Sequence, residues 1–177
     1  MRLIRFYALS IIFLIATAPL YAQPAETVRY EYYDVHGLTA QDIRASLDDH
    51  QRHTHGFGGH DAMTSSKLYW TSGARASVRV DILYQLPKWV DSEQAPADLR
   101  EAWHRFQKAI LVHEDGHRQL IEEEVQAIEQ MVLAAGPQPN GRLSHDVNIL
   151  MGTFDKKQIE YDRVTQHGRT QGAVFNC

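Results

Sequence analysis

The sequence predicts an α+β fold, in which a small antiparallel sheet packs against a long helix and a C-terminal helix. Three observations support this prediction. Apolar and polar residues alternate in the N-terminal half, as they do in half-buried strands. From residue 96 onward the apolar residues recur every three or four positions, as in amphipathic helices. The chain of 177 residues is 44% hydrophobic, which suits one globular domain with its own core.

Residues 1–22 have the features of a signal peptide, which leaves 23–177 as the single folded domain. Arg2 and Arg5 precede an apolar run from Phe6 to Leu20, and Ala22 completes a small-residue cleavage site. The run is short for a membrane span. We therefore expect a periplasmic or secreted protein with no stable membrane anchor after cleavage. Acidic side chains outnumber basic ones, 22 to 18, so nucleic acid is not an expected partner.

Alternation predicts three strands before residue 96, over 28–35, 67–71 and 77–86. Ser72 and Gly73 suit a hairpin turn between the last two strands. Pro87 is predicted to end the third strand because a proline lacks the N–H that a sheet requires.

A short helix over 40–49 is predicted between the first two strands, starting from a capping box that runs from Thr39 to Asp42. Residues 50–60 are rich in histidine and glycine. Because glycines interrupt helices and strands, this segment is predicted to be an exposed polar loop that could line a cleft.

One helix of up to about 37 residues is predicted between Pro96 and Gly136. Gly116, near its middle, is unfavourable in a helix. It could mark a kink or let another backbone segment come close. A last helix is predicted from Ser144 to Gln166, with Gly168 ending it.

The segment His113-Glu114-x-x-His117 lies inside the long helix. Histidines four residues apart lie on nearly the same helix face, so both imidazoles can bind one metal ion. Glu114 projects to one side, where it could take a proton from metal-bound water. This is the arrangement of zinc hydrolases, and it predicts Zn²⁺ as the cofactor, His113 and His117 as ligands, and Glu114 as catalytic base. Apolar residues before and after the pair predict that the histidines face inward.

A catalytic zinc site takes a third protein ligand, which the residue pattern leaves open. A metzincin would have a histidine at position 123, which is a glutamate here. The candidates are Asp155 in a Gly-Thr-x-Asp segment, Glu160, Asp162, and His167 at the end of the last helix. Glu124 lies about 10 Å along the helix from His117. Glu124 is therefore predicted as a carboxylate that orients a neighbouring residue or a histidine ring. Asp162 could also serve as a hydrogen-bond partner of His167.

Two segments together resemble a known family: His113-Glu114-x-Gly116-His117, and Tyr161-Asp162-x-x-Thr165-x-His167-Gly168. They look like the motifs of a bacterial family of predicted secreted zinc-dependent proteases, which is described as a domain of unknown function. Tyr33-Asp34-Val35-x-Gly37 and Pro87-x-Trp89 are similar as well, and the likeness covers about residues 28–172. The resemblance implies a zincin-like fold, His113, His117 and His167 as zinc ligands, and Glu114 as the base.

These residues predict a secreted or periplasmic zinc-dependent metallopeptidase, a hydrolase that cleaves peptide bonds in protein or peptide substrates. A zinc-activated water would attack the carbonyl carbon with Glu114 as general base. Tyr161 is predicted to help polarise the carbonyl oxygen. Two alternatives stay open. One is a non-catalytic periplasmic zinc-binding protein or pseudo-enzyme, which the His-rich segment 50–60 favours. The other is a zinc-dependent hydrolase of cell-wall amides.

Overall fold

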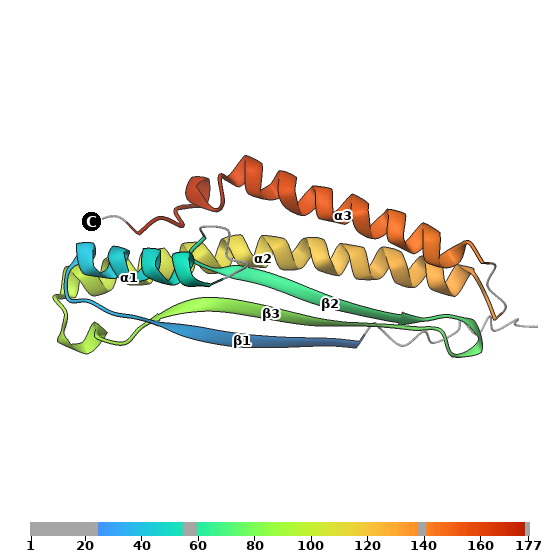
Figure 1. The fold of residues 1–177 in the computed structure, drawn as a ribbon, viewed down its shortest axis with the longest axis horizontal. Helices are drawn as coiled ribbons and strands as arrows, with labels where there is room; N and C mark the ends of the chain where they lie inside the picture. The colour runs from blue at the N-terminus through green and yellow to red at the C-terminus, as the bar shows by residue number, and fades with distance from the viewer. Residues whose placement is uncertain (1–24, 55–59, 138–140, 176–177) are drawn as a thin grey trace, which may run out of the picture.

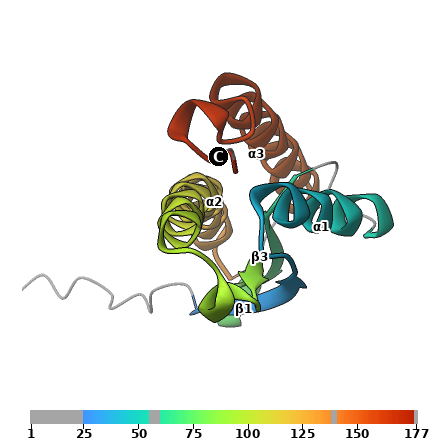
Figure 2. The ribbon, with the colours of Figure 1, turned by 90° about the vertical axis from the view of Figure 1, so that its left-hand side faces the viewer.

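The computed structural model describes residues 25–54, 60–137 and 141–175, and it confirms the α+β fold (Figure 1). A three-stranded sheet forms one layer, the long helix α2 (Ala97–Ala134) covers it, and α3 (Leu143–Thr165) lies on the far side of α2 (Figure 2). The predicted signal peptide, residues 1–22, falls outside the described residues, as do positions 55–59 of the His-rich segment.

The sheet consists of β1 (Ala25–Val35), β2 (Met63–Thr71) and β3 (Ser77–Trp89), in the order β1-β3-β2. β2 pairs with β3 in antiparallel fashion, as predicted, but β1 pairs with β3 in parallel. The sheet is therefore mixed, and the prediction of an antiparallel sheet was wrong for β1. Alternation of side chains shows which face of a strand is buried, and it carries no information on the direction of the neighbouring strand.

β3 is the central strand, and it continues past Pro87, where the sequence predicted its end. β2 pairs with β3 only as far as Gln85. Beyond that residue β3 has a described neighbour on one side only, which is β1. Pro87 therefore lies where one side of the strand is an edge, and a proline is tolerated at such a position.

Helix α1 (Ala40–His53) starts at the predicted cap, because the Thr39 hydroxyl accepts a hydrogen bond from the backbone N–H of Asp42 at 3.2 Å. The helix is four residues longer than predicted. His50 and His53 are therefore helical, which corrects the prediction of a loop from residue 50. Of the described residues of the His-rich segment, Thr54 and His60 lie outside regular structure.

Helix α2 runs without interruption through Gly116, and it buries one face against β3 and another against α3. An aromatic cluster closes one end of the core, where the C-terminal tail returns to α2; its members are Trp89, Trp103, Phe106 and Phe175. Three short 3₁₀ turns complete the fold: Gly73–Arg75, Ser92–Gln94 and Arg169–Gln171. Over the described ranges, no helix is both long and apolar enough to span a membrane.

Candidate metal centre

Helix α2 brings His113 and His117 together on consecutive turns, as the sequence predicts. The two Nε2 atoms are 3.2 Å apart, and the rings are nearly perpendicular, at 83°. His113 is 6% exposed. The pair therefore faces the interior, and its ring nitrogens need polar partners there.

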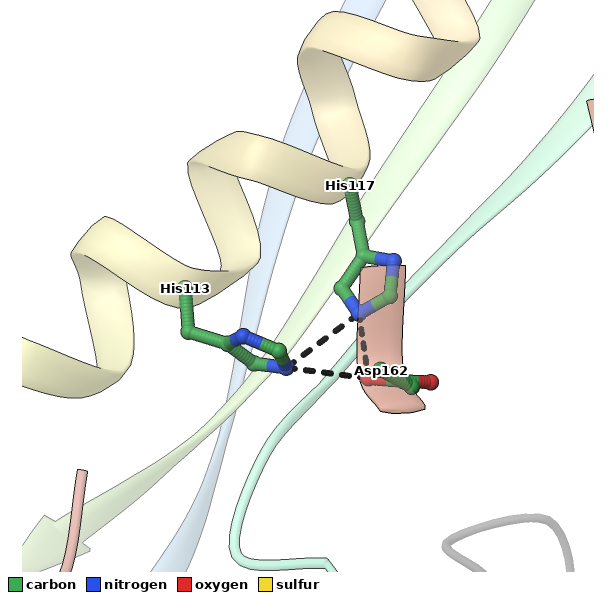
Figure 3. A group of neighbouring side chains, drawn as sticks. All are labelled: His113, His117 and Asp162. Carbon is green, nitrogen blue, oxygen red and sulfur yellow. Dashed lines mark hydrogen bonds and ion pairs between the residues drawn. The ribbon is translucent and has the colours of Figure 1, made fainter. Parts of the chain in front are cut away.

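Asp162 of α3 completes a group of three potential ligands (Figure 3). Its Oδ1 atom lies 3.0 Å from Nε2 of His117 and 3.2 Å from Nε2 of His113. The three atoms thus form a nearly equilateral triangle. Ligand atoms bound tetrahedrally at zinc distances are about 3.3 Å apart, so the triangle fits zinc. Among the described residues, no other group of three His, Cys, Asp or Glu side chains has ligand atoms this close together.

A glutamine on α3 sets the protonation of the His117 ring. The side-chain amide nitrogen of Gln158 donates to the backbone carbonyl of His117 at 3.2 Å, which turns the amide oxygen toward the ring. Nδ1 of His117 lies 2.6 Å from that oxygen. An amide oxygen can only accept, so Nδ1 of His117 carries the hydrogen. The Nε2 atom faces the triangle, where it is an acceptor when the ring is neutral. Burial by itself lowers the pKa of His117, but the hydrogen bonds to Asp162 and Gln158 raise that pKa above its ordinary value.

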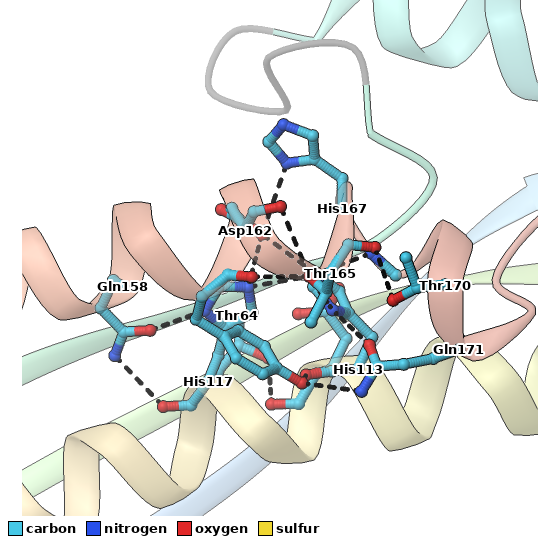
Figure 4. A network of polar contacts seen from close by, with 12 residues as sticks. Thr64, His113, His117, Gln158, Asp162, Thr165, His167, Thr170 and Gln171 are labelled. Carbon is cyan, nitrogen blue, oxygen red and sulfur yellow. Dashed lines mark hydrogen bonds and ion pairs between the residues drawn. The ribbon is translucent and has the colours of Figure 1, made fainter.

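His113 is held in the same way by Gln171 (Figure 4), and Tyr161 fixes the Gln171 amide. The Tyr161 hydroxyl donates to the backbone carbonyl of His113 at 3.1 Å and accepts the Gln171 side-chain N–H at 3.1 Å. The Gln171 amide oxygen therefore faces Nδ1 of His113, at 3.0 Å. Nδ1 of His113 must carry the hydrogen, and its Nε2 is also an acceptor.

With both rings neutral, three acceptors point at one another across 3.0–3.2 Å, and a shared cation would satisfy all of them. A single proton could serve only one of the three contacts, whereas an ion at the centre serves all three. Without an ion, hydrogen bonds from the imidazoles to Asp162 take its place. Burial by itself raises the pKa of the Asp162 carboxyl, but hydrogen bonds from His113 and His117 and the charge of His117 hold that pKa well below its usual range. The carboxylate is therefore negatively charged, as a metal ligand must be.

Glu114 lies beside the triangle and is 3% exposed. Its Oε2 atom is buried and has no hydrogen-bond partner among the residues that the structure describes. Burial raises the pKa of the Glu114 carboxyl, and the nearby Thr64, His117 and His113 lower it in part. A buried carboxylate with a free oxygen is in position to accept a proton from a bound molecule.

A cleft of about 710 Å³ opens over the triangle. One wall is the stripe of α2 that contains His113, Glu114 and His117. Four consecutive residues of β2, from Met63 to Ser66, line another wall. Side chains of a strand point alternately to opposite faces, so four residues in a row border the cleft through the free edge of the strand. β2 pairs only with β3, which leaves this edge open within the described sheet.

The sequence predicts that Tyr161 polarises the carbonyl oxygen of a substrate, but the Tyr161 hydroxyl does not point into the cleft. Its hydroxyl is occupied by His113 and Gln171, and its ring stacks on the His113 ring with centroids 5.1 Å apart. The ring lies directly over Gly116, where an added Cβ would be 2.0 Å from the hydroxyl oxygen. Gly116 therefore leaves room for the Tyr161 side chain of α3. The sequence had instead suggested that a backbone segment comes close to Gly116. The geometry makes Tyr161 a positioning residue.

His167, the predicted third ligand, lies outside the group of three. Its Nδ1 is 3.4 Å from Oδ1 of Asp162, and its side chain is 49% exposed. Its ring stacks on His60, with centroids 4.1 Å apart, and both residues line the cleft. Asp162, and not His167, therefore lies with the two histidines of α2 in the group of three.

The other candidate ligands do not belong to the triangle. Glu160 is exposed and paired with Arg163 at 2.6 Å. Glu124 and Asp155 line the cleft but do not belong to the group of three. Burial and the Asp155 charge raise the pKa of Glu124 to about 7. Among the residues that the structure describes, Glu124 makes no hydrogen bond or ion pair with a histidine, and the oxygens that face Nδ1 of His117 and of His113 belong to Gln158 and Gln171.

The Glu124 pKa predicts how stability depends on pH. The raised pKa means that ionisation is harder in the folded state, so stability falls as pH rises from about 4.5 to about 7. The shift corresponds to at most about 3 kcal/mol, which solvent screening reduces to about 1 kcal/mol. Glu124→Gln should therefore stabilise the protein by about 1 kcal/mol at pH 8 and by little at pH 4.5, measured by urea unfolding. Glu123→Gln, next to it and exposed, is the control. Equal gains at both pH values would contradict this explanation.

Two of the site residues were missed by the sequence analysis. Gln158, Tyr161, Asp162 and Thr165 lie at positions i, i+3, i+4 and i+7 of α3 and form a polar stripe. That spacing was available in the sequence and could have identified Gln158. Gln171 belongs to a 3₁₀ turn after the helix, and no periodic pattern marks it.

Fold and site together describe an α+β domain with a candidate metal centre between two helices. The chain belongs to the family described as "Bacterial protein of unknown function (DUF922)", whose profile matches residues 30–168. The matched range includes both the His113–His117 segment and residues 161–168. No curated protein and no solved structure matches the chain.

Proposed function

We propose that this DUF922 protein is a zinc-dependent metallopeptidase that acts in the periplasm or outside the cell. One observation carries the proposal: a buried carboxylate, Glu114, has a free oxygen beside three potential ligand atoms that a shared cation would satisfy. The export part of the proposal rests on the signal-peptide features of residues 1–22.

The proposed zinc ligands are Nε2 of His113, Nε2 of His117 and Oδ1 of Asp162. When bound there, zinc would supply Lewis acidity toward a carbonyl oxygen and toward water. Gln158 and Gln171 hold the two rings by their Nδ1 hydrogens, which keeps both Nε2 lone pairs directed at the ion.

Glu114 is the proposed general base. Its free Oε2 accepts a proton from the attacking water and then delivers that proton to the nitrogen of the leaving amine. Burial raises the pKa of this carboxyl, which makes the carboxylate a stronger base than an exposed glutamate. A protein that only stores or carries zinc has no use for such a group, so Glu114 favours an enzyme over the non-catalytic alternative.

The free edge of β2 supports a peptide as the substrate. An extended peptide can form main-chain hydrogen bonds with an open strand edge, and this edge borders the cleft at residues 63–66. Such pairing would align a peptide bond along the wall next to Glu114. A cell-wall amide that is not part of an extended peptide would not use the edge in this way.

Zinc titration of the purified protein tests the ligand assignment. The protein should bind one zinc ion per chain, and Asp162→Ala should weaken the affinity by about 100-fold or more because it removes a ligand. Asp155→Ala is the matched control, since Asp155 lies on the same helix and in the same cleft. It should leave the affinity nearly unchanged. Zinc loss in Asp155→Ala with retention in Asp162→Ala would contradict the assignment.

Hydrolysis of an unfolded protein tests the activity. The zinc-loaded protein should release new amino termini from denatured casein, a chelator should stop the reaction, and added zinc should restore it. Isolated peptidoglycan serves as the parallel substrate for the cell-wall alternative. If one zinc ion is bound but neither substrate is cleaved, the non-catalytic alternative takes the place of this proposal.

A further inference from the structure

We propose that His167 positions Asp162 by donating a hydrogen bond to it, and that His167 is not a zinc ligand. His60 holds the His167 ring in place. This inference rests on the proposed metal centre. It assigns to His167 and His60 a role that neither the family resemblance nor the proposed reaction gives them.

The surroundings of one oxygen atom support this role. Oδ1 of Asp162 faces His113 and His117, and Nδ1 of His167 lies 3.4 Å from the same oxygen, on the side of Asp162 away from those two histidines (Figure 4). A carboxylate oxygen has two lone pairs. If one is used toward the two histidines of α2, the other is available for the Nδ1–H of His167. Ligating carboxylates are commonly fixed by a second hydrogen bond of this kind.

The backbone turns sharply to bring His167 back to Asp162. Gln166 and His167 both have left-handed conformations, with φ of 51° and 52°, which residues other than glycine rarely adopt. The His167 N–H donates to the carbonyl of Asp162 at 2.9 Å, which keeps the two residues side by side. Strained backbone that persists in a folded protein is concentrated at functional sites. Here the strain places an imidazole next to a proposed ligand.

His60 holds the His167 ring from the opposite wall of the cleft. The two rings stack at 26°. The residue after His60 is firmly anchored, because the Asp61 carboxylate accepts hydrogen bonds from Arg44 at 2.8 Å and from Gln51 at 2.5 Å. His60 is thus fixed to α1 through the neighbouring Asp61. Its stacking on His167 limits rotation of the His167 side chain beside Asp162.

Two substitutions of His167 distinguish a hydrogen-bond donor to Asp162 from a zinc ligand. In His167→Asn the amide nitrogen is as many bonds from the backbone as Nδ1 of histidine, so it can still donate to Asp162, but it is a poor zinc ligand. In His167→Gly the donor is lost. Asparagine and glycine both tolerate the left-handed conformation, so both variants should fold, and thermal unfolding of the zinc-free forms checks this.

Zinc dissociation constants, measured by competition with a chromophoric chelator, give the result. We expect His167→Asn to stay within about threefold of wild type, and His167→Gly and His60→Leu to bind about 10- to 100-fold more weakly. His145→Asn, an exposed histidine of α3, should be unchanged. The cobalt-loaded His167→Asn protein should keep the wild-type visible spectrum, because its ligand set is the same.

Two results would overturn this inference. Equal loss of affinity in His167→Asn and His167→Gly, with a changed cobalt spectrum, would make His167 a ligand. Unchanged affinity in His167→Gly would remove any role at the centre. Absence of zinc binding by the wild-type protein is a separate result, which defeats the proposed function itself.

Discussion

Glu114→Gln is expected to lower kcat for hydrolysis by about 10²- to 10⁴-fold while zinc stays bound at one ion per chain. Glutamine has the shape of glutamate but cannot accept the proton of the attacking water. The metal should be retained because Glu114 is not among the three ligand groups. The fold should be retained as well. The hydrogen bond from Thr64 goes to the backbone carbonyl of Glu114, which the substitution does not change. The Oε2 atom of Glu114 has no hydrogen-bond partner to lose among the described residues.

Steady-state cleavage of a peptide substrate and metal analysis on the same samples measure this expectation. Glu129→Gln, on the same helix about four turns away, is the control and should keep both activity and zinc. Full turnover by zinc-loaded Glu114→Gln would exclude Glu114 as the base. Loss of zinc together with activity would show that the carboxylate serves the metal site in another way.

Gly116→Ala is expected to destabilise the protein by about 2 kcal/mol or more and to weaken zinc binding. The added Cβ would be 2.0 Å from the Tyr161 hydroxyl oxygen and 2.3 Å from the ring carbon that carries it. Overpacking typically costs about 1–3 kcal/mol and occasionally more. An approach of 2.0 Å belongs at the upper end of this range, so a net loss of about 2 kcal/mol is left after the gain of about 1 kcal/mol in helix propensity. α3 must then move away from α2, and it carries Asp162 with it.

Chemical denaturation and zinc titration measure the two effects. Gly152→Ala is the matched control on α3, because an added Cβ there meets no atom within 4 Å. It should stabilise the protein by up to about 1 kcal/mol. In a Tyr161→Ala background, Gly116→Ala should no longer destabilise, since the clashing ring is gone. Equal effects of Gly116→Ala with and without the Tyr161 ring would contradict the steric explanation.

The long helix and its histidine pair could be predicted because they depend on local periodicity. Residues three and four apart share a helix face whatever the rest of the chain does. His113, Glu114 and His117 could therefore be placed together from their spacing alone. The same reasoning fails for the direction of β1, which depends on how the chain returns across the sheet after α1.

The choice between Asp162 and His167 could not be made from the sequence. They lie five residues apart in one segment, and both residue types bind zinc. The choice depends on the left-handed turn at Gln166 and His167, and no glycine occupies either position to signal it. A turn of ordinary geometry would have directed His167 elsewhere.

The proposed ligands come from two helices, with the histidines on α2 and the carboxylate 45 residues later on α3. An unfolded chain therefore offers only an isolated histidine pair, which is a weak chelator. A metal that binds all three groups favours the folded state over the unfolded one and adds its binding energy to the docking of α3 on α2. With a single cysteine in its sequence, the chain cannot join these helices by an internal disulfide, and an ion could take over that cross-linking task.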